Sequence, residues 1–370
     1  MEKTRDKYDW LDIAKGITII LVMIFHAQLV DKKTDECYGF CRIFSDLCDP
    51  VIMPLFYFIS GELLYLSRIR NNWNVKDLYA DKAKRLIIPF VFFVNVYFLI
   101  KLFFNGLVKT QASISIEYYL KSYVFFAGYS SGALWFLATL FTLMLMYPLF
   151  RFLCRKTAYM SVFLAFCIGF YFVDLSEYIP NVFNIAEINN YLVFFFSGIF
   201  FFRYNINKYF DSYLVMIFST VLYFLCYYHF GYNFIVSLSG IFMICSWSHI
   251  LARYVPGMFS SFRDNIYQIY LMSMIFQAFV ELVLWKKLFY NENLVFLFYV
   301  LNILSGIVFP MLVVKVVKKC PVKIVRMCFG LWTCFKRNII NNKVVSHWEA
   351  KEIDKIWIPK IEMTSIKKLK

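Results

Sequence analysis

Charged side chains are scarce in this chain. Of its 370 residues only 17% are Asp, Glu, Lys or Arg, whereas 61% are hydrophobic and the mean hydropathy is +0.61. A soluble domain averages about 25% charged and about 45–50% apolar residues. A soluble core of this size cannot bury so much apolar surface, and a disordered chain would be poor in it. The composition excludes both classes and predicts an all-α, polytopic membrane bundle.

Acidic residues are even scarcer than basic ones. The chain has 24 Asp and Glu against 39 Lys and Arg, which gives a formal net charge of +15. An excess of this size in a soluble protein would suggest nucleic acid as a partner. In so apolar a chain it indicates cytoplasmic loops and contact with anionic lipids instead, so we expect no nucleic-acid partner.

Several sequence signals are missing altogether. None of the ten cysteines form a CxxC pair and their spacing matches no zinc pattern, so we expect no metal site. Cys37, Cys41 and Cys48 crowd one polar loop, where either one disulfide or free thiols are possible. The first apolar run begins near Ile13 and lacks a small-residue cleavage site, so we expect no cleavable signal peptide. We find no internal repeat.

Apolar runs of membrane-spanning length are abundant instead. A window of about 19 residues predicts ten spans. Thirty of the Lys and Arg residues fall on the side of the N-terminus and seven on the other side, so both termini should be cytoplasmic. We expect a membrane domain over residues 1–317 and a basic cytoplasmic tail over 318–370 that lies on anionic headgroups. The predicted spans are residues 13–30, 51–67, 87–104, 133–153, 159–175, 190–203, 212–229, 233–252, 266–285 and 294–317.

The first span carries two ionisable residues, which are costly in hydrocarbon and need an explanation. Lys15 and His26 are 11 positions apart, so they lie on one helix face, with about 16 Å between them along the axis. Lys15 is either an interfacial lysine that snorkels or a functional cation. His26 either makes a structural hydrogen bond to another helix or acts as a general base or nucleophile. Histidine is the side chain best suited to the second role near pH 7.

Further polar groups recur at the ends of later spans. Glu62 should lie at the depth of Lys15, so the two could pair, and the preceding Ser60-Gly61 permits close helix packing. Lys84 and Arg85 form a basic flank that could also hold phosphate groups.

The third predicted outside loop ends in a Gly/Ser turn that carries Tyr129 and Ser131 and leads into Trp135. Trp135 is either an interfacial anchor or an aromatic platform for a sugar ring.

Taken in order, these segments resemble the acyltransferase 3 family of bacterial membrane O-acyltransferases, and in particular its fucose 4-O-acetylase-like subgroup. The resemblance covers about residues 8–317, and no single piece is specific. The chain departs from the family pattern at two points. Lys15 stands where many members have Arg, so the side chain lacks the guanidinium group that can bind an anion through two hydrogen bonds. In addition, no His follows the last segment, where many members have one. The matching segments are Lys15-Gly16 through His26, Pro54 to Gly61, Arg85-Leu86 with Pro89, Trp135-Phe136-Leu137, Tyr191 to Gly198, and Asn265 to Leu271.

The resemblance implies transfer of an acyl group, usually acetyl, from cytoplasmic acyl-coenzyme A to a sugar hydroxyl. The acceptor would be a cell-envelope polysaccharide or its lipid-linked precursor, and the enzyme would lie in the bacterial cytoplasmic membrane. Acyl-CoA would be a co-substrate rather than a permanently bound cofactor.

In this reading Lys15, Lys84 and Arg85 hold the donor phosphates, and His26 acts with Lys15 and Glu62 in catalysis. Tyr129, Ser131 and Trp135 contact the sugar. The competing interpretation is a glycolipid or polysaccharide transporter or flippase without acyl-transfer activity, since intramembrane charges and aromatic cavities suit export as well.

Overall fold

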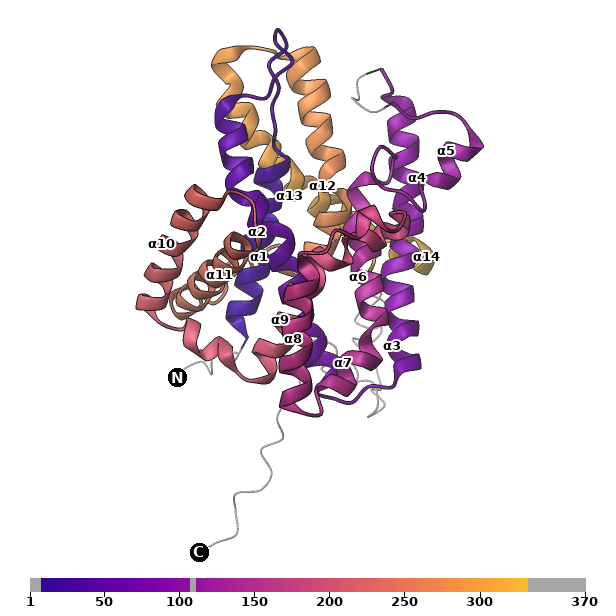
Figure 1. Cartoon of the computed structure of the whole chain (residues 1–370). Helices are drawn as coiled ribbons and strands as arrows, with labels where there is room; N and C mark the ends of the chain where they lie inside the picture. The colour runs from indigo at the N-terminus through magenta and orange to yellow at the C-terminus, as the bar shows by residue number, and fades with distance from the viewer. Residues whose placement is uncertain (1–7, 107–110, 332–370) are drawn as a thin grey trace, which may run out of the picture.

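The computed structural model describes residues 8–106 and 111–331, which form a helical bundle (Figure 1). No β-strand occurs in these ranges, and the only strand-like pairing is an isolated bridge between Val30 and Cys37. The predicted all-α fold is therefore confirmed for the part of the chain that is described.

Twelve helices of seven residues or more account for most of the bundle, and two shorter ones complete it. Three π-helical stretches extend or join them: Tyr65–Ile69 follows α2, Ala83–Ile87 joins α3 to α4, and Val280–Leu288 follows α12. The longer helices are α1 (Asp9–His26), α2 (Gly39–Leu64), α3 (Val75–Lys82), α4 (Ile88–Phe103), α6 (Trp135–Leu145), α7 (Tyr147–Leu153), α8 (Thr157–Tyr171), α9 (Ile188–Arg203), α10 (Tyr213–Phe230), α11 (Phe234–Tyr254), α12 (Ile266–Phe279) and α13 (Val295–Lys319), and the short ones are α5 (Ile116–Lys121) and α14 (Lys323–Cys328).

Within residues 8–106 and 111–331, seven helical segments are long and apolar enough to cross a membrane, or eight if the bent pair α6 and α7 forms one span. The predicted count of ten is not confirmed. Each of the two remaining predicted spans coincides with a helix that falls short for a physical reason. Helix α1 carries Asp9, Asp12 and Lys15, and α8 has only 15 residues.

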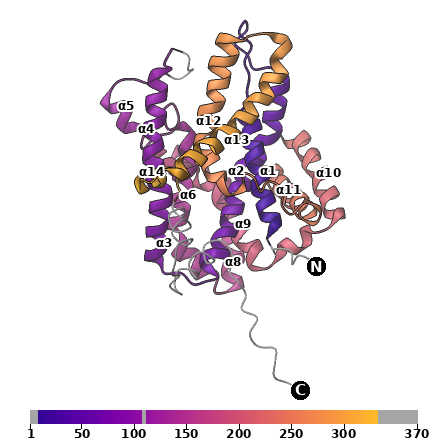
Figure 2. The same ribbon diagram turned by 180° about the vertical axis from the view of Figure 1, so that it is seen from behind.

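The centre of the bundle is a close crossing of α2 and α9, with α1 and α11 packed beside them (Figures 1 and 2). A Cβ atom added to Gly61 would lie 1.9 Å from the carbonyl oxygen of Phe195, and one added to Gly198 would lie 2.0 Å from that of Phe58. Only glycine lets the two backbones approach so closely. The packing role expected for the Ser60-Gly61 site is therefore present.

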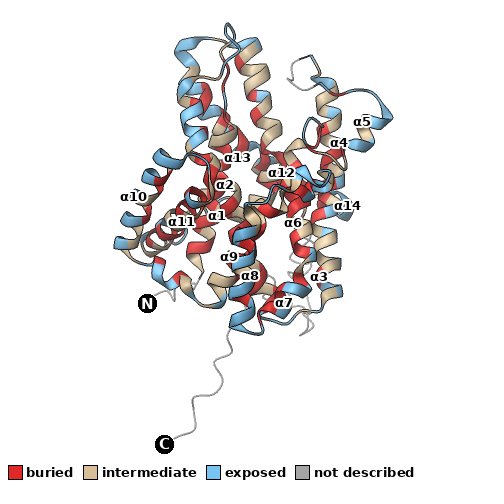
Figure 3. Cartoon of the chain, in the orientation of Figure 1, coloured by how far each residue is buried: buried red, intermediate tan, exposed pale blue. Residues whose placement is uncertain are grey.

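The outside of the bundle is apolar, whereas the most deeply buried residues lie along the central helices (Figure 3). Large apolar side chains such as Leu214, Phe218 and Val316 are exposed on outward faces. A surface of this kind is unfavourable in water and is typical of helices that face lipid.

The chain continues past α13 as part of the bundle. Gln268 on α12 donates hydrogen bonds to the carbonyl oxygens of Phe329 and Gly330, and the Phe329 ring packs on Phe92 and Phe93 of α4. The rest of the predicted basic tail, residues 332–370, lies outside the described residues. Cys37, Cys41 and Cys48 form no disulfide, and neither do the other cysteines in the described ranges.

Candidate functional site

Lys15 projects from the first half of α1 and is mostly buried, with 13% of its side chain exposed. Its Nζ lies 2.6 Å from Oδ1 of Asp12, one turn earlier on the same helix. The other oxygen of Asp12 lies 3.5 Å from the guanidinium of Arg263, which comes just before α12. The ion pair that lowers the cost of burying Lys15 is thus local, and Arg263 ties it to α12.

Glu62 lies in the last turn of α2 and is completely buried. The Asn207 side chain is next to its carboxylate, and Lys15 is near enough for its charge to act on it. No described donor meets hydrogen-bond geometry with either carboxylate oxygen. The expected proximity of Lys15 and Glu62 is present, but the carboxylate that Lys15 contacts within 3 Å is that of Asp12.

His26 is the last residue of α1, and side chains from other segments hold the helix end in place. Gln277 of α12 donates a buried hydrogen bond of 2.9 Å from Nε2 to the Met23 carbonyl oxygen. Ser45 of α2 and Gln28 both donate to the Phe25 carbonyl oxygen at 3.3 Å. Carbonyl groups at a helix end have no partner within the helix, so these bonds fix the turn that carries the half-buried imidazole.

The loop after His26 is attached to the hairpin between α12 and α13. The indole of Trp285 donates to the Val30 carbonyl oxygen at 2.9 Å, and the Tyr290 hydroxyl donates to Asp31 at 2.9 Å. The backbone amide of Lys33 and this hydroxyl lower the pKa of the Asp31 carboxyl below its ordinary value. The ionised form of Asp31 is therefore favoured, and it anchors the loop at neutral pH.

Lys84 and Arg85 lie in the π-helical stretch that leads into α4. Arg85 donates from Nε to Asp81 at 2.7 Å, and Lys84 is exposed. Tyr267 of α12 donates to the Arg85 carbonyl oxygen at 2.9 Å. Since Arg263 and Tyr267 are one turn apart, the start of α12 contacts both Asp12, the partner of Lys15, and Arg85. Lys15 and the backbone of Arg85 thus lie near the same end of α12, and Lys84 directly precedes Arg85 in the chain.

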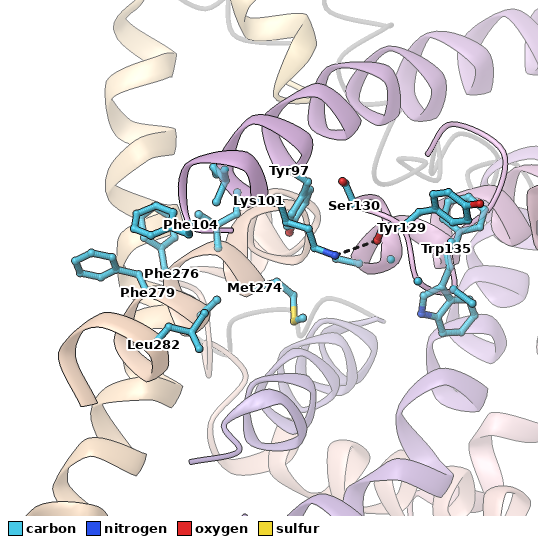
Figure 4. A pocket seen from close by; sticks show the side chains of 18 of the residues that line it. Tyr97, Lys101, Phe104, Tyr129, Ser130, Trp135, Met274, Phe276, Phe279 and Leu282 are labelled. Carbon is cyan, nitrogen blue, oxygen red and sulfur yellow. Dashed lines mark hydrogen bonds between the residues drawn. The ribbon is translucent and has the colours of Figure 1, made fainter. Parts of the chain in front are cut away.

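A large cavity of about 980 Å³ opens between α4, α12 and the segments before α6 and α9 (Figure 4). Its walls are mostly apolar, with aromatic rings such as Phe104, Phe276 and Phe279 on one side. Lys101 donates from Nζ to the Tyr129 carbonyl oxygen at 3.2 Å across it. A cavity with an apolar lining and a few placed polar groups is typical of small-molecule sites.

The predicted sugar-binding residues fall at this cavity with one exception. Tyr129 and Trp135 line it, and the Trp135 ring lies 5.5 Å from that of Tyr191, another lining residue. Ser131 is fully buried and donates to the Phe125 carbonyl oxygen, so it shapes the turn instead. The neighbouring Ser130 is a lining residue.

Other polar lining residues were not singled out by sequence reasoning. Lys101 comes from the end of α4, and Asn181, Asn184 and Glu187 come from the segment before α9. Asn184 has a left-handed backbone, with φ of 57°, and donates to Thr139 on α6 at 2.8 Å. The run of polar residues between the fifth and sixth predicted spans was the sequence signal that could have indicated Asn181, Asn184 and Glu187.

His26 and Lys15 line neither this cavity nor the second one described below. Met274, Ala278 and Leu282 of α12 and of its π-helical extension line the large cavity. Gln277, on the opposite face of α12, bonds to the last turn of α1. One helix thus separates the large cavity from the turn that bears His26.

Comparison with known proteins gives one match. Residues 8–333 match the model of the acyltransferase 3 family, which is described as an acyltransferase domain. No curated protein and no solved structure matches the chain.

Proposed function

Because the chain belongs to the acyltransferase 3 family, we propose that this multi-pass membrane protein transfers an acetyl group from cytoplasmic acyl-coenzyme A to a sugar hydroxyl. The acceptor is a cell-envelope polysaccharide or its lipid-linked precursor, and the enzyme lies in the bacterial cytoplasmic membrane. The resemblance to the fucose 4-O-acetylase-like subgroup supports a sugar hydroxyl as the acceptor.

The observation that carries the proposal is the fixed position of His26. Its backbone turn is held by Gln277 of α12 and Ser45 of α2, so the imidazole is presented from a rigid support. A group that must accept a proton in the transition state benefits from such positioning. Lys15 lies on the same face of α1, three turns nearer the opposite end of the helix, which suits a donor that extends along α1.

His26 can act by two routes. As a general base, its neutral imidazole takes the proton of the acceptor hydroxyl while the oxygen attacks the thioester carbonyl carbon. The carbon–sulfur bond then breaks, and the coenzyme A thiolate takes up the proton. As a nucleophile, an imidazole nitrogen attacks the thioester carbonyl carbon, the carbon–sulfur bond breaks, and the coenzyme A thiolate leaves with the imidazole proton. The acceptor hydroxyl then attacks the acyl-imidazole, and its proton returns to the ring as the ester is released.

We assign the donor phosphates to Lys15, Lys84 and Arg85 at the start of α12, and the large cavity to a part of the acceptor glycan other than the reacting hydroxyl, since α12 separates this cavity from His26. Trp135, Tyr129 and Tyr191 offer aromatic faces there, and Asn184 and Glu187 offer hydrogen-bonding groups. Glu62 is fully buried, with Asn207 beside it and Lys15 nearby, so we assign it a positioning role rather than contact with the substrate.

The test compares envelope glycans from cells that carry the wild-type chain or His26→Ala. Mass spectrometry should show a loss of about 42 Da, the mass of an acetyl group, per sugar unit in the variant. Transfer should fall by at least about 100-fold, because a positioned acid–base group contributes about 10²–10⁴-fold. His229→Ala, which removes an exposed histidine on α10 that lines neither cavity, is the matched control and should retain most activity.

Retention of the acetyl group in His26→Ala, with the protein inserted at wild-type levels, would refute the mechanism. If the glycan disappears from the cell surface instead of losing 42 Da, the protein is a transporter. Rapid quenching with labelled acyl-coenzyme A separates the two routes, since only the nucleophilic route leaves label on His26.

A further inference from the structure

A second cavity, of about 580 Å³, lies at the end of the bundle where α1 begins. Four segments that are distant in the sequence converge on it. They are the start of α1 with Trp10, the stretch after α2 with Arg70, the end of α9 with Arg203 and the residues after it, and the end of α11 with His249 and Arg253.

The lining of this cavity is rich in cations. Arg70, Arg203, Lys208 and Arg253 line it, against the carboxylates of Asp9 and Asp211. Arg253 donates to Asp211 at 2.7 Å, and Arg203 donates to the Tyr65 hydroxyl at 3.2 Å.

Arg70 and Lys208 have no carboxylate within 4 Å in the described part of the chain. Both side chains are exposed at the mouth. Two cations are therefore available to an incoming anion.

The floor of the cavity is polar and connects to the candidate site. Trp10 and His249 stack with ring centroids 4.3 Å apart and form one wall. Asn207, which is 6% exposed, lies at the floor beside the buried Glu62. A ligand in the cavity would be separated from Glu62 by the Asn207 side chain.

The volume limits the kind of ligand. Small-molecule sites usually measure about 300–1,000 Å³, so this cavity can hold a phosphate group together with the body that carries it. Arginine and lysine bind phosphate oxygens through charge-assisted hydrogen bonds. We propose that this cavity is a binding site for a phosphate-bearing ligand, which Arg70 and Lys208 capture at the mouth and Arg203 and Arg253 hold within.

Basic side chains that line neither cavity offer a comparison. Arg155 and Lys156, between α7 and α8, are exposed and lie over the rings of Phe152 and Tyr159 on the surface. They line neither cavity. Arg155 and Lys156 therefore provide a matched control, because they carry the same charge as Arg70 and Lys208 but do not line a cavity.

The experiment uses the full chain in phosphatidylcholine nanodiscs and measures its melting temperature against three probes. ADP represents a nucleotide, phosphatidylglycerol in the nanodisc represents a lipid headgroup, and inorganic phosphate represents the free group. We expect saturable stabilisation by at least one probe. Arg70→Gln/Lys208→Gln should weaken the apparent affinity at least about tenfold, and Arg155→Gln/Lys156→Gln less than about twofold.

The responding probe identifies the source of the phosphate. A shift with ADP alone assigns a nucleotide, and a shift with phosphatidylglycerol alone assigns a lipid headgroup. The proposal fails if no probe stabilises the protein or if the two double variants weaken binding equally. The site does not depend on acyl transfer, so His26→Ala should bind the probe like the wild type.

Discussion

At the scale of single residues, Lys15 shows how an ion pair lowers the free-energy cost of burying a charged side chain. Asp12 lies 2.6 Å from its Nζ, and Arg263 shares that carboxylate from α12. Asp12 is itself partly exposed, and Arg263 also lies 3.6 Å from the carboxylate of Asp264. Lys15 and Arg263 can still bind a donor phosphate, because cations form charge-assisted hydrogen bonds with phosphate oxygens.

We predict that Lys15→Met raises KM for acyl-coenzyme A about 10- to 100-fold and changes kcat much less. Losing a charge-assisted hydrogen bond costs about 1.5–3 kcal/mol, and a contact with the donor phosphates acts on binding rather than on the chemical step. Lys15→Arg should retain most of the affinity because it keeps the charge. Steady-state kinetics with the purified protein in nanodiscs measures both constants.

Asp12→Asn is the informative companion to these variants. It removes the carboxylate that Lys15 and Arg263 share, so it should loosen the start of α12 without raising KM as strongly. An unchanged KM in Lys15→Met would remove Lys15 from the donor site.

At the scale of elements, the crossing of α2 and α9 determines where the buried carboxylate lies. Gly61 precedes Glu62 directly, and Gly198 on α9 faces Phe58, one turn before Glu62. The absence of a side chain at both glycines brings the backbones together and carries Glu62 into the interior. The same contact therefore supports stability and the position of Glu62.

Gly61→Ala should destabilise the protein by about 1–3 kcal/mol or more, as overpacking does in close contacts. The new Cβ would lie 1.9 Å from the Phe195 carbonyl oxygen, and backbone cannot move aside as a flexible side chain could. The melting temperature in detergent measures the effect. Gly169→Ala on α8 is the matched control, since its Cβ would meet nothing within 4 Å.

That control should leave the melting temperature unchanged or raise it, because glycine within a helix costs about 0.5–1 kcal/mol relative to alanine. Equal melting temperatures for Gly61→Ala and the wild type would mean that α2 and α9 are not in backbone contact.

The elements themselves could largely be read from the sequence, since apolar runs in lipid must form helices. The π-helical stretches could not, because they arise from packing rather than from composition. The bend between α6 and α7 lies next to Pro148, a sequence signal that the prediction of one span over residues 133–153 did not use. Lys15 and Glu62 were predicted to pair because they should lie at the same depth in the membrane. The carboxylate that Lys15 contacts is that of Asp12, because a contact between positions i and i+3 of one helix does not depend on the tertiary fold.

Some residues of the large cavity could be predicted from local sequence patterns, and others could not. Trp135 and Tyr129 could be singled out because a Gly/Ser turn precedes them in the sequence. Lys101 and Asn184 reach the same cavity from α4 and from a left-handed turn, and no local pattern places them together. Gln277 likewise meets the end of α1 from 254 positions away.

At the scale of the whole molecule, the two cavities and the charge distribution favour one orientation. The smaller, cation-rich cavity lies where α1 begins, on the side to which the sequence assigns 30 of the 39 Lys and Arg residues. The large cavity is lined by the end of α4 and the later part of α12. A donor from the cytoplasm and an acceptor in the envelope would thus approach from opposite ends.

Single cysteines at the two ends of α2 test this orientation. Thr34, before α2, and Asn71, after its π-helical extension, are both exposed, and the 26-residue helix between them is about 39 Å long, enough to cross the bilayer. In a Cys37→Ser background, an impermeant maleimide should label Thr34→Cys in intact cells and Asn71→Cys only after lysis. The reverse pattern would place Lys15, Lys84 and Arg85 outside the cell, away from cytoplasmic acyl-coenzyme A, and the proposed donor site would then be untenable.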